Sequence, residues 1–258
     1  MEVVIVADAA AAGDLAAARV AEVVEAMPDA VLGVATGSSH LATYRALAAR
    51  REAGLDLSRV SAFALDEYVG LARRHPESYR EVIAREVTAP LGLDPARVHV
   101  PKGDAADLAA ECARYERRIA ISGIDLQLLG IGANGHIGFN EPTSSLSSRT
   151  RVKSLSVRTR ADNARFFASA DDVPTHCITQ GLGTILDADR VLLVATGERK
   201  AEAVAQMVEG SLSAMWPGSV LQLHRRATVI VDEAAAGGLR MQDYYREAAA
   251  ASEALRAR

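Results

Sequence analysis

A glycine-rich stretch carries the side chains best suited to move protons. His136 lies inside the run Gly132-Ala133-Asn134-Gly135-His136-Ile137-Gly138, and Glu141 follows shortly after. An imidazole titrates near neutral pH, and a neighbouring carboxylate or amide can fix its tautomer and orientation. We therefore interpret Asn134, His136 and Glu141 as an acid–base group. The alternative is a structural histidine in a turn, but the close glycine framing favours the functional interpretation.

The element before this stretch would place the group at the edge of a sheet. The apolar run Asp125–Gly130 predicts a buried parallel strand, and the glycines allow a sharp turn at its carboxyl end. Ligands of open α/β sheets bind outside the carboxyl ends of the strands. His136 and Glu141 would then face a ligand site.

A second carboxylate follows another predicted strand. Val60–Leu65 is succeeded by Asp66-Glu67-Tyr68. Adjacent residues of an extended chain point to opposite faces, so only one of the two carboxylates should face a given pocket. A carboxylate surrounded by apolar groups has a raised pKa and can act as a general base. Taken alone, the segment fits a helix cap or a surface turn better.

Three places could hold a phosphate. Thr36-Gly37-Ser38-Ser39 lies between a predicted strand and a predicted helix, where backbone N–H groups and hydroxyls suit an anion. It lacks the Gly-Lys-Ser/Thr ending of a Walker loop, and an ordinary N-cap explains it equally well. Arg165 and Lys200 could close on the same phosphate, although most single cations lie on solvated helix faces.

The composition limits the class of protein. The chain has 258 residues, 49% of them hydrophobic, with no linker, charge block or repeat, so we expect one domain over residues 1–258. A formal net charge of −4 argues against a broad nucleic-acid surface, and no apolar run is long enough to cross a membrane. Cys112 and Cys177 lack metal-ligand spacing and fit reduced core residues of a cytoplasmic protein. Zinc at His136 is disfavoured because no third ligand is evident.

Apolar runs alternate with helical patterns along the chain. This alternation predicts a single-domain, Rossmann-like α/β fold with a mostly parallel sheet and helices on both faces. Strands are expected at Glu2–Ala7, Val31–Ala35, Val60–Leu65, Asp125–Gly130, Val191–Ala195 and Thr228–Val231. Helices are expected at Asp14–Met27, from Thr36-Gly37-Ser38-Ser39 to about Arg50, at Ser78–Thr88, Ala105–Ile121, Arg160–Phe167, Ile178–Leu186 and Glu198–Glu209, and at the C-terminus, with a break at Pro90.

In order, these segments resemble the glucosamine-6-phosphate deaminase (glucosamine-6-phosphate isomerase) family over nearly the whole chain. A single matching segment would be weak support, but the collinear set is specific. The segments that carry the resemblance are Leu32–Ser38, Leu65–Leu71, His75–Tyr79, Gly130–Pro142, Ser148–Arg151, Ala164–Phe167, Gly183–Ala188, Met215–Pro217 and Leu221–His224.

The resemblance implies conversion of glucosamine 6-phosphate and water to fructose 6-phosphate and ammonia, in amino-sugar and N-acetylglucosamine catabolism, without a cofactor. Asp66 matches the general base that moves a proton between C2 and C1 through an enolamine. His136 matches the ring-opening acid–base residue, supported by Glu141 and Asn134. Thr36 to Ser39, Arg165 and Lys200 match the phosphate-binding positions.

Two features of the chain bear on what the resemblance implies. Many family members have Asp where this chain has Asn134, and an amide can orient His136 but cannot stabilise an imidazolium as a charge would. Ser144, Arg151 and Lys153 match positions that bind the activator N-acetylglucosamine 6-phosphate in allosteric hexameric members. Their presence permits activation and a homo-oligomer without showing either, because that site lies between subunits.

Three alternatives stay open. A 6-phosphogluconolactonase shares the general fold and a glycine-rich turn with histidine, but lactone hydrolysis needs no C2 base. A deaminase for galactosamine 6-phosphate would differ by a few polar contacts. A non-enzymatic sugar-phosphate sensor would keep the phosphate residues and lose the acid–base set, which this chain retains at Asp66, His136 and Glu141.

Overall fold

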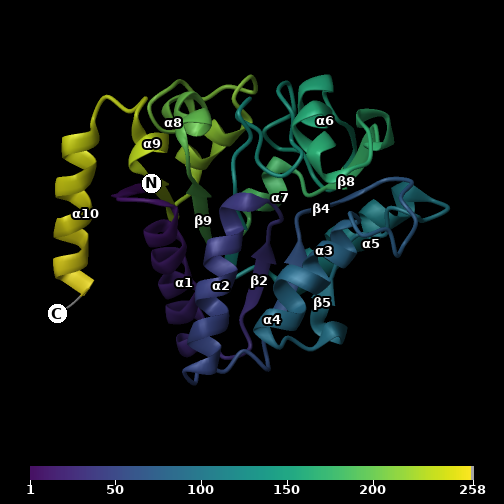
Figure 1. The fold of residues 1–258 in the computed structure, drawn as a ribbon, viewed down its shortest axis with the longest axis horizontal. Coiled ribbons are helices and arrows are strands. Elements are labelled where there is room, and N and C mark those ends of the chain that lie inside the picture. Colours follow the sequence, from purple (N-terminus) through teal and green to yellow (C-terminus); the bar gives the residue numbers. More distant parts are fainter. Residues whose placement is uncertain (257–258) are drawn as a thin grey trace.

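The computed structural model describes residues 1–256 and is built around a large parallel sheet (Figure 1). Within that part of the chain the sheet has seven strands in the order β1-β10-β9-β6-β2-β3-β5, and every neighbouring pair is parallel. Its strands are β1 (Glu2–Val6), β2 (Val31–Val34), β3 (Ser61–Ala64), β5 (Val98–His99), β6 (Leu126–Leu129), β9 (Arg190–Ala195) and β10 (Ala227–Asp232). The strand order reverses between β2 and β6, and α/β sheets bind ligands at such a reversal.

Helices connect the strands. The α-helices are α1 (Ala9–Ala26), α2 (Ser38–Glu52), α3 (Tyr79–Ile83), α4 (Ala89–Leu91), α5 (Leu108–Ser122), α6 (Val157–Asn163), α7 (Leu182–Leu186), α8 (Ala201–Val208), α9 (Glu233–Ala236) and α10 (Gln242–Arg256). Single π or 3-10 segments are η1 (Ala84–Thr88), η2 (Pro95–Arg97), η3 (Ala164–Phe166), η4 (Ala170–Asp172), η5 (Glu198–Lys200) and η6 (Pro217–Leu223). None of the described helices is long and apolar enough to cross a membrane.

Each face of the sheet has its own apolar core. Along β9, Leu192 and Val194 join the core formed with α1 and α2, whereas Leu193 and Ala195 join the core formed with α5, α7 and α8. Strands buried on both faces explain why the sequence shows continuous apolar runs rather than alternation. The predicted fold class is thereby confirmed.

A second, smaller sheet lies beside the carboxyl ends of the large one and was not expected. It is antiparallel, in the order β4-β8-β7, with β4 at Asp66–Tyr68, β8 at His176–Thr179 and β7 at Arg151–Ser154. The predicted helix Ile178–Leu186 is therefore wrong in its first part, because Ile178 and Thr179 belong to β8. These β-prone residues pair with strands far away in the sequence, and such pairing overrides local propensity.

The expected break at Pro90 was also wrong. The helix from Tyr79 runs on through a π-helical turn at Ala84–Thr88 into α4, which contains Pro90. Proline lacks the N–H that an α-helix would use at this point, and a π turn changes the hydrogen-bonding pattern just before it. The remaining predicted helices are present with boundaries shifted by a few residues.

Helix α10 lies apart from the other helices, beside the edge strand β1 (Figure 1). Tyr245 of α10 packs against the core, and Glu253 pairs with Arg19 of α1. At the opposite edge, β5 is only two residues long.

Candidate active site

The predicted site residues follow four neighbouring strands. Thr36 to Ser39 come after β2, Asp66 after β3, the glycine-rich turn after β6 and Lys200 after β9. Because β9, β6, β2 and β3 are adjacent in the sheet, their carboxyl-end segments meet at one edge. The structure therefore brings together segments that are distant in the sequence.

Asp66 is a buried carboxylate beneath the glycine-rich turn. It is 6% exposed, and a Cβ added to Gly138 would stand 3.6 Å from Asp66 Oδ2. Burial raises the pKa of Asp66 to about 8, the charge of Glu67 adds to the rise, and a hydrogen bond from the Phe139 amide opposes it. A carboxyl group of this pKa can take up and release a proton near neutral pH.

Glu67, next to Asp66, has a structural role instead. Its carboxylate accepts the backbone N–H groups of Tyr68 and Tyr79 at 2.8 Å and that of Arg80 at 3.0 Å. These bonds satisfy donors at the start of α3, where no intrahelical acceptor exists. The prediction that only one of the two carboxylates faces the site agrees with these contacts.

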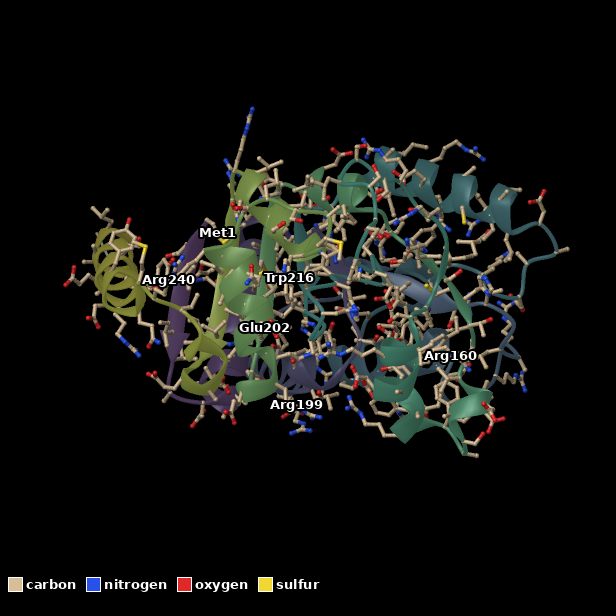
Figure 2. All side chains as sticks on the ribbon, turned by 90° about the horizontal axis from the view of Figure 1, so that it is seen from above. Met1, Arg160, Arg199, Glu202, Trp216 and Arg240 are labelled. Atoms are coloured by element: carbon tan, nitrogen blue, oxygen red, sulfur yellow. The ribbon has the colours of Figure 1, made fainter. Side chains whose placement is uncertain are left out.

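Two glycines give His136 its place in the turn. A Cβ at Gly132 would collide with the His136 ring, so this backbone must lack a side chain. Gly135 has a φ of 82°, in the left-handed region, and a Cβ there would stand 2.6 Å from the Trp216 ring. Viewed from above, Trp216 lies near the middle of the molecule, between Met1 and Arg240 on one side and Arg160 on the other (Figure 2). Trp216 thus packs against the turn.

The acid–base group forms a connected set. Asn134 Nδ2 donates to Glu141 Oε2 at 2.7 Å, and Asn134 Oδ1 accepts the His136 backbone N–H at 3.3 Å. His136 Nδ1 lies 3.8 Å from Glu141 Oε2, an ion-pair distance rather than a hydrogen bond. Burial acts to raise the pKa of Glu141, but interactions with His136, Thr159 and the Ser156 amide outweigh it and hold the pKa at about 2. Glu141 is therefore an anion at neutral pH and can stabilise a protonated His136.

The phosphate-side residues make fewer contacts. Lys200 Nζ donates to the Ile131 carbonyl at 2.6 Å, and burial lowers the pKa of Lys200, with the charges of Arg199 and Arg165 contributing. Arg165 is exposed on η3, 4.7 Å from the centroid of the Phe166 ring. Because the charge of Arg165 contributes to the lowered pKa of Lys200, the two cations are close enough to interact.

The loop Thr36-Gly37-Ser38-Ser39 starts α2 without a side-chain cap. Gly37 is the N-cap residue, with a φ of 109°, and no side chain bonds the first-turn amides. The alternative interpretation of this loop, in which it is an ordinary N-cap made by a Ser or Thr side chain, is therefore wrong. Exposed amides at the start of a fifteen-residue helix can accept an anion.

Sequence reasoning gave no role to an aromatic cluster that adjoins the acid–base group. The rings of Tyr68 and Tyr79 lie 4.8 Å apart, and those of Tyr79 and Phe139 are stacked at 5.8 Å. Burial raises the pKa of Tyr79 well above its usual value, and a hydrogen bond with Thr36 opposes the rise. Tyr79 thus connects the phosphate loop with the Asp66 side of the site. The segment His75–Tyr79 was its only signal in the sequence.

Two of the three residues at the predicted effector positions already form hydrogen bonds within the chain. Ser144 is buried and its hydroxyl donates to the Glu141 carbonyl at 2.6 Å. Arg151 Nη1 donates to Asn140 Oδ1 at 2.9 Å. Lys153 is half-buried, two residues along the same strand.

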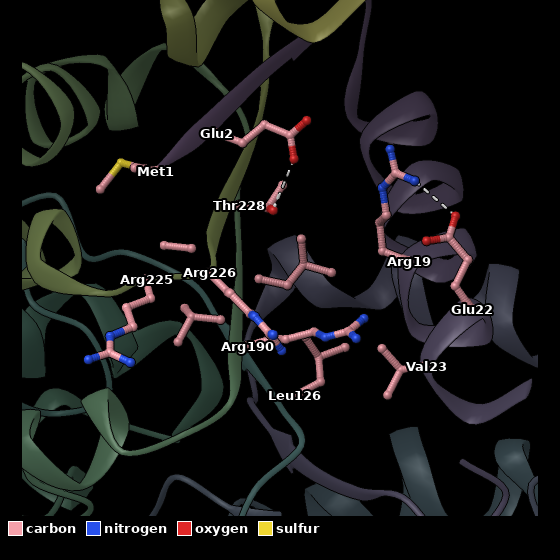
Figure 3. A pocket seen from close by; sticks show the side chains of 13 residues that line it. Met1, Glu2, Arg19, Glu22, Val23, Leu126, Arg190, Arg225, Arg226 and Thr228 are labelled. Atoms are coloured by element: carbon pink, nitrogen blue, oxygen red, sulfur yellow. Dashed lines mark hydrogen bonds and ion pairs between the residues drawn. The ribbon is translucent and has the colours of Figure 1, made fainter. Parts of the chain in front are cut away.

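A pocket of about 460 Å³ lies at the other end of the large sheet (Figure 3). It is lined by the amino ends of β1, β9 and β10 and includes Arg190, Arg225 and Arg226. Arg226 pairs with Asp189 at 2.8 Å, and Arg19 pairs with Glu22 at 2.8 Å, so much of its positive charge is already balanced. No residue of the acid–base group lines it, and we assign the chemistry to the carboxyl ends.

Metal ligands and disulfides are absent from the described residues. Within residues 1–256 there is no group of three or more His, Cys, Asp or Glu arranged to hold a metal ion. Cys112 and Cys177 are both buried and unpaired.

Residues 6–230 match the family model of glucosamine-6-phosphate isomerases/6-phosphogluconolactonase. The chain belongs to this family. Two curated relatives named glucosamine-6-phosphate deaminase come from Pseudarthrobacter chlorophenolicus and Streptomyces coelicolor. They are 59% and 57% identical, and each alignment covers 95% of this chain and 95% of the relative.

Two solved structures resemble this chain to different degrees. A protein described as a monomeric glucosamine-6-phosphate deaminase is 42% identical, with a TM-score of 0.90, covering 92% of this chain and 100% of its own. A 6-phosphogluconolactonase from Trypanosoma cruzi is 17% identical, with a TM-score of 0.74, covering 93% of this chain and 97% of its own. The second likeness shows a shared fold.

Proposed function

We propose that this chain catalyses the conversion of glucosamine 6-phosphate and water to fructose 6-phosphate and ammonia. One observation carries the proposal: a buried carboxyl group with a pKa of about 8, Asp66, lies directly under a turn that holds the His136–Glu141 pair. This arrangement supports a base and a separate acid–base residue acting on one small ligand. Relatives from several genera that are 54–59% identical and carry the deaminase name support the same reaction.

Each acid–base residue has a role that its surroundings support. His136, held near anionic Glu141, takes a proton from the C1 hydroxyl and delivers one to the ring oxygen, so that the bond between C1 and the ring oxygen breaks and the sugar opens to its aldehyde form. Asp66, as a carboxylate, removes the proton from C2 and returns it to C1 through an enolamine. The imine then lies at C2, and water releases ammonia. Proton transfers of this kind contribute roughly 10²–10⁴-fold each.

The phosphate would be held on the opposite side of the site. The amides and hydroxyls of Thr36 to Ser39 offer hydrogen bonds, and Lys200 and Arg165 offer charge. Lys200 is already oriented by the Ile131 carbonyl, whereas Arg165 is exposed and would have to move onto the ligand. Binding energy from this remote group positions C1 and C2 over Asp66.

The assay that tests the proposal measures ammonia and fructose 6-phosphate from glucosamine 6-phosphate. Galactosamine 6-phosphate and 6-phosphogluconolactone are run in parallel with the same enzyme. Release from the gluco epimer at least about tenfold faster than from the galacto epimer supports the proposal, since tenfold corresponds to one or two well-made polar contacts. Lactone hydrolysis without ammonia release would contradict it, and binding without turnover would identify a sensor.

The proposal extends to the whole molecule. Residues 1–258 would act as one catalytic domain, and two buried unpaired cysteines fit the reducing cytoplasm. The ligand is a small sugar phosphate, with no nucleic acid or membrane. A homo-oligomer, a hexamer if the effector positions work, is the predicted assembly, and light scattering would distinguish it from a monomer such as the solved relative.

A further inference from the structure

Asn140, which precedes Glu141, is a buried hub between the catalytic turn and the small sheet. It is fully buried, and its Nδ2 donates to the Ile137 carbonyl at 2.9 Å and to the Gln180 carbonyl at 2.8 Å. Its remaining side-chain acceptor, Oδ1, receives Arg151 Nη1 at 2.9 Å. Asn140 can satisfy all of these bonds only in one orientation, which Arg151 fixes from the sheet side.

The small sheet also aligns Arg151 with the proposed base. Thr179 of β8 is paired with Asp66 on one side and with Arg151 on the other, so the three residues form one row across the sheet. Directly paired residues share a face of an antiparallel sheet. Thr179 Oγ1 accepts the Phe139 backbone N–H at 3.1 Å, which ties the turn to the middle of the row.

The surroundings of Arg151 differ from those of Arg149, two residues earlier in the chain. Arg149 is exposed and pairs with Asp187 and Glu116. Among the described residues Arg151 has no carboxylate within ion-pair distance, and its Nη2 is buried without a hydrogen-bond partner; burial lowers the pKa of Arg151. An arginine kept in this costly position for stability alone would be expected to have a carboxylate partner. Its Nη1 donates to Asn140, in the segment that carries Glu141, and makes a longer bond of 3.4 Å to the Arg149 carbonyl.

We propose that Arg151 is a positioning residue of the active site, which holds Asn140 so that the His136–Glu141 turn stays seated over Asp66. Thr143 is consistent with a tightly held segment, because it keeps a φ of 73°, which a β-branched residue adopts only when its surroundings impose it. The inference deepens the proposed deaminase activity and rests on it. It also gives Arg151 a role in the absence of any effector.

The first test compares Arg151→Met with Arg117→Met; Arg117 is an exposed arginine on α5 whose side chain forms no hydrogen bond or ion pair among the residues that the structure describes. Arg151→Met should lower kcat about 10–100-fold while KM changes less than about threefold, since a displacement near 1 Å is enough for such a loss. Arg151→Lys, which keeps the charge and the fold but not the guanidinium geometry, should lose about 3–10-fold. The Arg117→Met enzyme should match the wild type in both parameters.

A double-mutant cycle shows whether Arg151 acts through Asn140. In an Asn140→Ala background, Arg151→Met should cost less than about twofold in kcat, because the contact is already gone. Independent, additive losses would overturn the proposal.

Hydrogen exchange separates this inference from the proposed function. Amides of residues 136–141 should exchange faster in Arg151→Met than in the wild type, whether or not ammonia is released. If Arg151→Met keeps wild-type kcat and exchange, and loses only a response to N-acetylglucosamine 6-phosphate, Arg151 is an effector ligand and the proposal is wrong. If the wild type releases no ammonia, the proposed function fails, and the exchange data alone decide whether Arg151 holds the turn.

Discussion

The two sides of the candidate site are built differently. On the proton-transfer side, Asp66, Asn140 and Glu141 are buried, and hydrogen bonds to backbone and side chains hold Asn140 and Glu141. On the phosphate side, Gly37 and Ser38 are exposed, and Arg165 contacts the ring of its neighbour Phe166. The proton-transfer side is assembled before any ligand arrives, whereas the phosphate side is open apart from Lys200, which already donates to the Ile131 carbonyl.

The difference follows from what each side has to do. Proton transfer requires heavy atoms within hydrogen-bonding distance of the reacting carbon or oxygen, and small displacements are costly. A phosphate dianion attracts cations over a longer range, so an exposed guanidinium can close on it after binding. Substitutions on the two sides should therefore affect different kinetic parameters.

The largest effect is expected at Asp66. Asp66→Asn keeps the size of the side chain but removes the base, so kcat should fall by about 10³-fold or more. Sugar-phosphate binding, measured by calorimetry, should stay within about tenfold, because the phosphate side is intact. Near-wild-type turnover in this variant would show that Asp66 is not the base and would remove the main distinction between the two sides.

Arg165→Ala should raise KM and leave kcat nearly unchanged. Loss of a charge-assisted contact with phosphate corresponds to roughly 1.5–3 kcal/mol, or about 10–100-fold in KM, with kcat within about threefold. Steady-state kinetics with Arg158→Ala provides the control, since Arg158 is an exposed arginine on α6 that forms no hydrogen bond or ion pair within residues 1–256. An equal fall in kcat for Arg165→Ala would mean that this side also takes part in the chemistry.

Activity and stability should depend on pH in opposite directions through Asp66. The base must be ionised, so kcat/KM should fall about tenfold per pH unit below the Asp66 pKa of about 8. The native state binds this proton more tightly than the unfolded chain does, so its contribution to stability is complete below about pH 4 and is lost as the pH rises through 8. Urea unfolding should therefore show Asp66→Asn gaining stability over the wild type by more than about 1 kcal/mol between those limits. A pH-independent difference would contradict the raised pKa.

Asn134→Asp should have the smallest effect. The amide now donates to Glu141 Oε2, and a carboxylate would replace that bond with repulsion between like charges. Partial compensation comes from the added charge near His136, so we expect a loss of only about 3–10-fold in kcat and an unchanged KM. A gain in kcat would show that charge at position 134 matters more than the donated hydrogen bond.

The sequence predicted the large sheet well and the small sheet not at all. Val191–Ala195 is a continuous apolar run that few structures other than a buried strand can accommodate. Strand β7 reads Arg-Val-Lys-Ser, and it becomes a strand only because Cys177 and Ile178 are brought alongside it. Pairing over such sequence distances leaves no local pattern to recognise.

The sequence could place some of the candidate side chains along the sheet but not the contacts made by others. Asp66, His136 and Lys200 lie in segments that follow strands β3, β6 and β9, so the rule for carboxyl ends predicts that these segments meet at one edge. The contact of Arg151 with Asn140 depends on the small sheet, and Tyr79 reaches the site from a helix. Neither could be placed without the tertiary structure.

The two edges of the large sheet differ in how they avoid adding a strand from another molecule. Strand β5 has two residues, which offer too few unpaired N–H and C=O groups to act as a template. Strand β1 has five, and helix α10 packs beside it. Shortening the chain before Gln242 would uncover β1, and the cost would be measured as concentration-dependent aggregation even where catalysis in dilute solution was unchanged.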